Sequence, residues 1–193
     1  MSPLSSIKSE LRLYMNGALA QSLRERGLTY RLIFGIELPR LKEIAAKYTP
    51  DHDLAAALWH EDIRECRILA GYLQPAETFT PELADVWLDA MHDTEIIDYT
   101  CMNLFRRLPF AKDKAFQWIA SEAVLTQYAG FRLMAHLHPS ITGGVGVGSF
   151  FSRDFDELAD QIEAVLASPS VPAFLRAVAQ DVRDRMEEAE KVR

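Results

Sequence analysis

The chain has 193 residues, of which 49% are hydrophobic and 25% charged, a composition that excludes a disordered, collagenous or fibrous protein. Its net charge of −7, from 21 basic and 28 acidic side chains, argues against a protein that holds nucleic acid by total charge alone. Two cysteines exclude a disulfide framework, and no stretch suits a secretory signal or a membrane helix, so we expect one soluble, cytoplasmic domain over residues 1–193.

Charge is unevenly distributed along the chain. Residues 1–47 carry a net charge of +4 and residues 106–140 carry +3, whereas residues 48–105 carry −10 and residues 141–193 carry −4. Alternating basic and acidic blocks are compatible with one basic face on an acidic protein. The total charge therefore leaves both nucleic-acid and protein partners open.

The first 48 residues predict an N-terminal helical cap. Apolar periodicity predicts one helix over Leu4–Arg26, which should end at Gly27, and a second over Pro39–Tyr48. The proline that begins the second helix is at a first-turn position, where proline is tolerated. No segment shows convincing strand alternation, so we expect an all-α protein.

Beyond the cap, three tryptophans reveal a repeat of helix pairs. Trp59, Trp87 and Trp118 are spaced by 28 and 31 residues, and each lies in the first helix of an expected pair. A single pair cannot bury its apolar stripe, so stacking of pairs is the physical solution. We therefore predict an α-solenoid of HEAT-like helix pairs. The alternative is an unrelated helical bundle with coincident tryptophans.

The expected helices share apolar residues at spacings of three and four. The first pair is expected over Leu54–Trp59 and Ile63–Leu73, the second over Thr80–Met91 and Asp93–Leu108, and the third over Ala111–Ala120 and Ser121–His138. The fourth pair is expected to begin at Asp154, to break at Ser168-Pro169 and to resume from Pro172. Thr80 is expected to cap its helix and Val86 to lie on its apolar stripe. Asp154 is expected to form a capping box with Glu157.

Residues 139–151 are predicted to form a flexible glycine-rich loop. No strand precedes Gly143–Gly148 and no Lys-Ser/Thr completes it, so this segment does not predict a phosphate-binding loop. His136 and His138 are two residues apart, which on a helix separates their side chains by about 200° and excludes a shared metal ion. Ordinary surface or capping histidines are the favoured interpretation, and no metal ion or cofactor is expected.

One expected helix carries polar residues in a pattern that suits chemistry. Thr94 and Asp98 lie at positions i and i+4, so they share a face that is turned about 100° from the core-facing Ile97. Arg132 lies in the second helix of the next pair, one turn after Tyr128. A carboxylate and a guanidinium from neighbouring pairs could thus face one groove. From the residues alone, a solvated aspartate and a structural ion pair between repeats are the favoured alternatives.

Two segments resemble a known family. Gly35–Ala45 reads Gly-Ile-Glu-Leu-Pro-Arg-Leu-Lys-Glu-Ile-Ala, and Leu54–Ala70 contains Leu-Trp followed by Glu-x-Arg-x-Leu-Ala. These motifs resemble the HEAT-like repeat DNA alkylation repair family, the AlkD-type DNA glycosylases, over roughly Phe34 to Leu137. The resemblance implies a HEAT-like superhelix that binds duplex DNA along its concave face and needs no metal ion.

The resemblance also implies an activity. Active members hydrolyse the N-glycosidic bond of cationic alkylated purines such as 3-methyladenine and 7-methylguanine. The family's catalytic aspartate would correspond to Asp98, its motif tryptophan to Thr94 and its groove arginine to Arg132, while a later DNA-facing tryptophan would fall near Asp181. Asp98 would then stabilise the oxocarbenium-like sugar, by roughly 4 kcal/mol at about 4 Å and an effective dielectric of about 20.

Several residues near Asp98 in the chain are candidates for contact with DNA. Each has a polar or basic side chain that could contact a phosphate: Thr94, Arg106, Arg107, Lys112, Lys114 and Arg132. The adjacent arginines have an alternative interpretation, because cations are also favoured at the C-terminus of any helix.

Two functions therefore stay open. The first is a DNA alkylation repair-like protein, an expected monomer that binds damaged duplex DNA and has DNA glycosylase activity. The second is a catalytically silent relative that binds DNA structures or is a scaffold for a protein partner, which Thr94, Asp181 and the net charge of −7 favour. A continuous basic concave groove with Asp98 exposed supports the first, and an acidic or blocked groove supports the second. Burial of Asp98 against a neighbouring cation would exclude the repair function.

Overall fold

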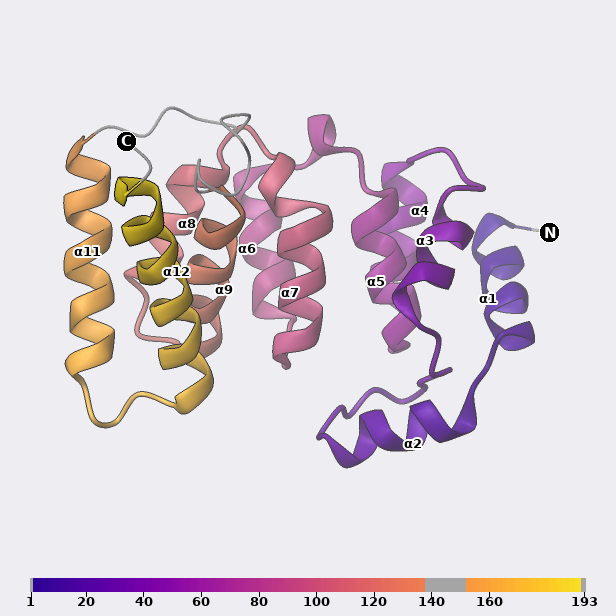
Figure 1. Ribbon diagram of the computed structural model, residues 1–193. Coiled ribbons are helices and arrows are strands. Elements are labelled where there is room, and N and C mark those ends of the chain that lie inside the picture. Colours follow the sequence, from indigo (N-terminus) through magenta and orange to yellow (C-terminus); the bar gives the residue numbers. More distant parts are fainter. Residues whose placement is uncertain (1, 138–151, 192–193) are drawn as a thin grey trace. The chain divides into compact units, whose positions relative to one another are not determined.

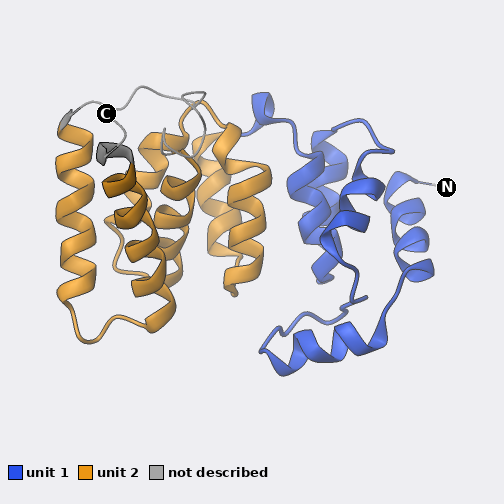
Figure 2. Cartoon of the chain, in the orientation of Figure 1, with its two compact units in different colours: residues 1–79 blue, residues 80–193 orange. Residues whose placement is uncertain are grey.

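The computed structural model describes residues 2–137 and 152–191 (Figure 1). The expected loop over residues 139–151 lies outside the described residues, and so does His138. The chain divides into two compact units, Met1–Phe79 (unit 1) and Thr80–Arg193 (unit 2), which are coloured separately in Figure 2. Among the described residues, the helices are joined by loops that contain a single isolated β-bridge, and no helix is long and apolar enough to cross a membrane.

Unit 1 is built from short helices. They are α1 (Pro3–Leu13), α2 (Gly17–Glu25), α3 (Leu38–Ala45), α4 (His52–Trp59), α5 (Arg64–Leu73) and a 3-10 turn, η1 (Ala76–Thr78). The helices α1 and α4 pack together, as do α3 and α5, and α4 and α5. The last of these is the first helix pair that the sequence predicts.

The single helix expected over Leu4–Arg26 is wrong, because the chain breaks it after Leu13. Asn16 caps α2, since its side-chain oxygen accepts a hydrogen bond from the backbone N–H of Leu19 at 3.1 Å. The backbone N–H of Asn16 donates to the carbonyl of Phe34 at 2.8 Å. The break therefore rests on a contact with a segment 18 residues further along, which helical periodicity does not report.

A buried carboxylate joins the two segments on which the family resemblance rests. Glu65, in α5, is fully buried and accepts hydrogen bonds from the backbone N–H groups of Phe34 and Gly35 at 3.0 Å and of Ile36 at 3.3 Å. Arg64 donates to Glu65 at 3.0 Å and to the carbonyl of Ile36 at 3.1 Å. These bonds satisfy backbone groups that enter the core without a helix or strand partner.

Unit 2 contains the remaining helices. They are α6 (Pro81–Asp89), α7 (Thr94–Asn103), the 3-10 turn η2 (Phe105–Arg107), α8 (Ala111–Ile119), α9 (Val124–Leu137), α11 (Ser152–Ala167) and α12 (Ala173–Lys191). Thr80 caps α6 as predicted, since its hydroxyl accepts from the N–H of Leu83 at 3.2 Å. Asp93 caps α7 in the same way, and its carboxylate accepts from Ile96 at 3.0 Å.

Two expectations for single residues in unit 2 are wrong. Asp154 does not cap α11 but lies inside it, buried, where it accepts a hydrogen bond from Lys112 at 3.0 Å. A partner 42 residues away has thus replaced the local capping box. Val86 is exposed rather than on the apolar stripe of α6, because the helix buries the faces that carry Ala84, Trp87 and Leu88 instead.

The tryptophan repeat marks equivalent positions. Trp59, Trp87 and Trp118 are all buried and lie in α4, α6 and α8, the first helices of their pairs. In unit 2, α8 packs on α9 and α11 on α12, while α9 also contacts α7 and α12. Helices therefore pack both within a pair and between neighbouring pairs, which is the arrangement of HEAT-like repeats.

Candidate functional site

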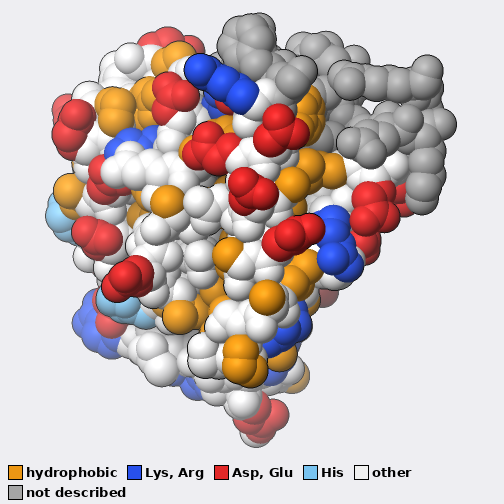
Figure 3. Space-filling model, turned by 90° about the vertical axis from the view of Figure 1, so that its left-hand side faces the viewer, with side chains coloured by type: hydrophobic (Ala, Val, Ile, Leu, Met, Phe, Trp, Pro, Cys, Tyr) orange, Lys and Arg blue, Asp and Glu red, His pale blue; other side chains and the backbone are white. Residues whose placement is uncertain are grey.

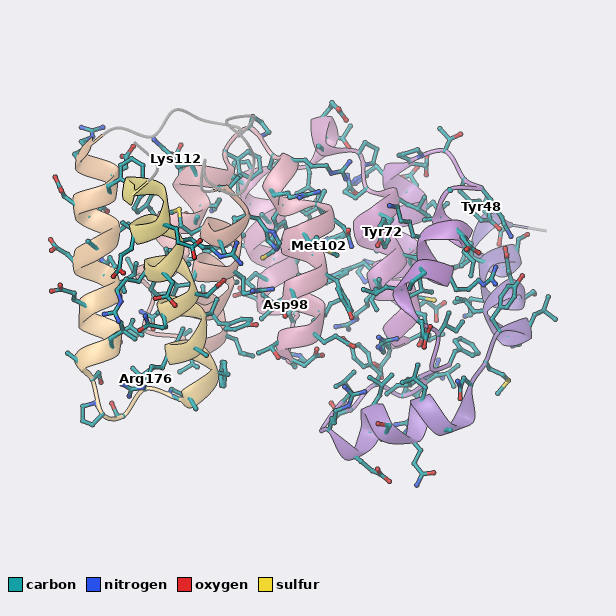
Figure 4. The ribbon with its side chains drawn as sticks, in the orientation of Figure 1. Tyr48, Tyr72, Asp98, Met102, Lys112 and Arg176 are labelled. Carbon is teal, nitrogen blue, oxygen red and sulfur yellow. The ribbon has the colours of Figure 1, made fainter. Side chains whose placement is uncertain are left out.

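The polar pair that the sequence predicts is formed between α7 and α9. Asp98 lies in the second turn of α7, where Figure 4 labels it. Its Oδ1 atom accepts a hydrogen bond from Nε of Arg132 at 2.7 Å and another from the hydroxyl of Tyr128 at 2.8 Å. Tyr128 and Arg132 are one turn apart on α9, so one face of that helix supplies both donors. This spacing is visible in the sequence, which by itself gives no reason to assign Tyr128 a role.

Asp98 and Arg132 are partly exposed. The side chain of Asp98 keeps 31% of its surface accessible and that of Arg132 keeps 27%. Burial raises the pKa of Asp98, while the charge of Arg132 and the hydroxyl of Tyr128 act in the opposite direction and do not fully cancel the effect. Burial lowers the pKa of Arg132, but Asp98 outweighs this and the net pKa is raised. Asp98 thus contacts a cation without being sealed from solvent.

The ion pair leaves hydrogen-bonding capacity unused. Both hydrogen bonds to Asp98 reach Oδ1, and within residues 2–137 and 152–191 no donor reaches Oδ2. Arg132 donates through Nε, and no described residue accepts from its two terminal amino groups. One carboxylate oxygen and two amino groups therefore stay available for a ligand.

Thr94 lies on the same helix as Asp98, and two arginines lie in the 3-10 turn that packs on α9. Thr94 begins α7, one turn before Asp98, and is half-buried. Arg106 and Arg107 are exposed in η2, which follows α7 and packs on α9. The predicted DNA contacts at these positions are compatible with their exposure.

The two lysines expected to contact DNA lie elsewhere. Lys112, labelled in Figure 4, pairs with buried Asp154 at 3.0 Å. Lys114 is buried and pairs with Asp85 at 2.5 Å, while the other oxygen of Asp85 accepts from the indole N–H of Trp118 at 2.8 Å. These lysines connect helices of unit 2, and their charges are already matched by carboxylates. The side chains of Lys112 and Lys114 keep only 18% and 10% of their surface exposed, so a phosphate would have to displace those partners, and we propose neither lysine as a phosphate contact.

His136, which the sequence predicts to be an ordinary surface or capping histidine, lies next to the pair. His136 lies one turn after Arg132 on α9, is half-buried, and its Nε2 atom has no hydrogen-bond partner among the described residues. Burial, followed by the charges of Arg132, Arg106 and Arg185, lowers its pKa to about 4. Its position at i+4 from Arg132 is the signal that could have identified it. His136 is therefore neutral at pH 7, between basic side chains of three elements.

The charge of unit 2 differs between its faces. Figure 3 views the end formed by α11, where exposed acidic side chains gather: Asp156, Glu157, Asp160 and Glu163. On α12, Asp181 pairs with Arg185 at 3.0 Å. A polyanion would be repelled by the outer side of α11, which favours the surface around α7, η2 and α9 for any contact with phosphates. No group of residues suited to a metal ion occurs in the described part of the chain.

Comparisons with known proteins agree with this fold. A family model described as "DNA alkylation repair enzyme" matches residues 7–185, nearly the whole chain. A solved structure described as "A new family of proteins related to the HEAT-like repeat DNA glycosylases with affinity for branched DNA structures" superposes with a TM-score of 0.80 at 18% identity. The alignment covers 95% of this chain and 75% of that one. No curated protein matches significantly. The predicted all-α, HEAT-like fold class is confirmed.

Proposed function

Because this chain belongs to the DNA alkylation repair enzyme family, we propose that it binds damaged duplex DNA at the surface formed by α7, η2 and α9 and hydrolyses the N-glycosidic bond of cationic alkylated purines. The observation that carries this proposal is the arrangement of Asp98. Its Oδ1 atom is fixed by Tyr128 and Arg132, while no donor from the described part of the chain reaches Oδ2. A carboxylate held in this way is positioned by its own protein before a substrate arrives.

The chemistry needs little beyond that carboxylate. A cationic purine leaves as a neutral base and takes the electron pair of the C1′–N bond, so no acid has to protonate it. The sugar becomes oxocarbenium-like, and a water molecule then adds to C1′ and loses one proton to the solvent. Asp98 stabilises the positive sugar and orients the water. A full carboxylate at about 4 Å is worth roughly 4 kcal/mol at an effective dielectric of about 20, and the ion pair with Arg132 reduces that value.

The arginines supply affinity. Arg132 offers a phosphate beside Asp98 the two amino groups that no described residue occupies, and the exposed Arg106 and Arg107 offer two more contacts. Thr94 occupies the place where the family resemblance implies a tryptophan. An aromatic face against a cationic base contributes about 0.5–2 kcal/mol, so its loss weakens the site without removing the carboxylate.

The activity is tested by release of methylated purines from alkylated duplex DNA. We expect the wild type to release 3-methyladenine or 7-methylguanine and Asp98→Asn to be at least about 100-fold slower, because the neutral amide cannot stabilise the cationic sugar. Asp89→Asn, at an exposed position on α6, is the matched control and should keep the wild-type rate. Equal rates for wild type and Asp98→Asn would remove Asp98 from the mechanism.

A second candidate is a protein that binds DNA structures without cleaving them. It is favoured by the pairing of Asp98 with Arg132, by Thr94, and by the affinity for branched DNA in the description of the similar structure. Retention of a four-way junction without base release would support this function. If the protein retains neither the alkylated duplex nor the four-way junction, the remaining hypothesis, a scaffold for a protein partner, is favoured.

A further inference from the structure

The connection between α1 and α2 presents three consecutive apolar side chains to solvent. Leu13, Tyr14 and Met15 expose 80%, 39% and 64% of their surface, and we call them the apolar tip. The other large apolar side chains that are exposed in the described part of the chain, such as Val86 in α6, are not part of such a run. Clustered exposed apolar residues indicate an interaction surface, whereas isolated ones are common on any protein.

The apolar tip is held in place from both sides. The backbone N–H of Tyr14 donates to the carbonyl of Leu11 at 3.2 Å, and that of Asn16 donates to Phe34 at 2.8 Å. Gly35 lies so close that a Cβ atom at that position would be 2.2 Å from the carbonyl oxygen of Asn16. The ends of the tip are therefore fixed before any partner binds, which lowers the entropic cost of an interaction.

The surroundings of the apolar tip favour a polyanion. The guanidinium of Arg40 lies over the ring of Tyr14, 4.6 Å from its centroid, while it also pairs with Glu43. Arg12 is exposed directly before the tip and forms no ion pair among the described residues. Glu10 is paired with Lys47. The neighbouring acids are thus matched, and Arg12 adds an unmatched positive charge.

The net charge of unit 1 is also compatible with a polyanionic partner. Residues 1–79 contain ten basic and ten acidic side chains, so the net charge of −7 resides entirely in residues 80–193. A polyanion that approaches the apolar tip therefore meets a unit without net charge and, among the residues around the tip, an excess of one cation, Arg12. An acidic or purely apolar protein surface would make less use of that arrangement.

We propose that the apolar tip is a second DNA contact, in which Leu13 and Met15 stack against base pairs exposed at a branch point while Arg12 and Arg40 face the adjoining phosphates. This inference rests on the proposed DNA binding. Apolar side chains contact base faces only where the stack is interrupted, since opening a continuous duplex costs a few kcal/mol per step. The tip therefore distinguishes branched DNA from continuous duplex, whereas the arginines alone would bind both.

The test compares two DNA probes. One is a four-way junction, and the other is a dumbbell duplex of the same base composition, whose closed ends expose no base pair. For the double variant Leu13→Ser/Met15→Ser we expect about tenfold weaker binding of the junction and less than about a twofold change for the dumbbell. Val86→Ser is the matched control, because it removes an equally exposed apolar side chain from unit 2 and should change neither affinity.

The outcomes separate this inference from the proposed function. If the double variant binds both probes like the wild type, or loses affinity for both equally, the role of the apolar tip is overturned while DNA binding stands. If the wild type binds neither probe, DNA binding itself fails and the tip inference falls with it. Sedimentation of wild type and variant is measured in parallel. A wild-type dimer that the double substitution dissociates would assign the apolar tip to a second copy of the chain and overturn the proposal.

Discussion

At the scale of single residues, the carboxylates of Glu65 and Asp98 differ in burial. This difference separates a carboxylate that stabilises the fold from one that can contact a ligand. Glu65 is fully buried, and three backbone N–H groups together with Arg64 occupy its oxygens. Asp98 is partly exposed, and among the described residues two donors reach its Oδ1 atom and none reaches Oδ2. The first is fixed for stability and has no capacity left for a ligand. The second remains available, which is why the proposed chemistry involves Asp98.

Glu65 gives a stability prediction. Glu65→Gln should lower the free energy of unfolding by about 3–5 kcal/mol, because the amide cannot accept all the hydrogen bonds and Arg64 is left as an uncompensated buried charge. Glu77→Gln, at an exposed position in η1, should leave it within about 0.5 kcal/mol. Urea unfolding measures both. Equal stability of the two variants would show that the buried pair does not support unit 1.

His136 predicts a dependence of stability on pH. Its pKa is about 4 in the folded protein and near the ordinary 6.5 in the unfolded chain, so the unfolded chain binds the extra proton between these values. The free energy of unfolding should therefore decrease as the pH falls from about 6.5 to about 4, by about 1–3 kcal/mol for this half-buried group. In urea titrations at several pH values, His136→Gln should remove that part of the decrease. An unchanged pH profile would contradict the assignment.

At the scale of the helices, glycine sets the distance between α8 and α9. A Cβ atom at Gly130 would lie 2.5 Å from the backbone nitrogen of Ile119 and 2.8 Å from the carbonyl oxygen of Ala115, whereas a Cβ atom at Gly71 in α5 would meet nothing within 4 Å. Both glycines are helical, so they share the same gain in helix propensity on substitution by alanine. The difference between the two substitutions therefore reports the steric contact alone.

We expect opposite signs for these substitutions. Gly71→Ala should raise the free energy of unfolding by about 0.5–1 kcal/mol through helix propensity. Gly130→Ala should lower it by about 1–3 kcal/mol, since backbone atoms must shift to admit the methyl group. Thermal or urea unfolding of the two variants and the wild type measures both changes in the free energy of unfolding. A stabilising Gly130→Ala would mean that α8 and α9 do not approach as closely as the structure shows.

Local sequence signals predicted helices where the determining contacts are local. Thr80 caps its helix as expected, the helix expected to open at Asp93 begins there with Asp93 as its cap, and the tryptophan spacing located the first helices of the pairs. Where a residue contacts a partner distant in the sequence, predictions from local signals were wrong. The break before Asn16 depends on Phe34, and Asp154 is taken from its capping role by Lys112. Such contacts become visible only once the chain is folded.

The candidate site follows the same division. Equivalent positions in successive second helices placed Asp98 opposite Arg132, and the structure brings the two together. The sequence does not distinguish Lys112 and Lys114 from the arginines as candidate DNA contacts, because the partner of a lysine cannot be identified without the fold. In the structure both lysines are paired with carboxylates. The roles in catalysis and DNA binding stay predictions.

At the scale of the whole molecule, charge limits where DNA can bind. The net charge of −7 resides in unit 2, and the exposed side of α11 is acidic. Binding at unit 2 must therefore use a local group of cations, and Arg132, Arg106 and Arg107 form the one we propose. Each phosphate contact that is lost lowers the dependence of affinity on salt by about one unit on a logarithmic scale.

The salt dependence of DNA affinity for Arg132→Gln tests the central claim most directly. With a dumbbell duplex, the slope of log Kd against log salt should fall by about one relative to the wild type, and affinity at low salt should fall with it. Arg153→Gln, an exposed arginine on α11, should keep the wild-type slope. Identical slopes for wild type and Arg132→Gln, or an equal change for Arg153→Gln, would contradict DNA binding beside Asp98.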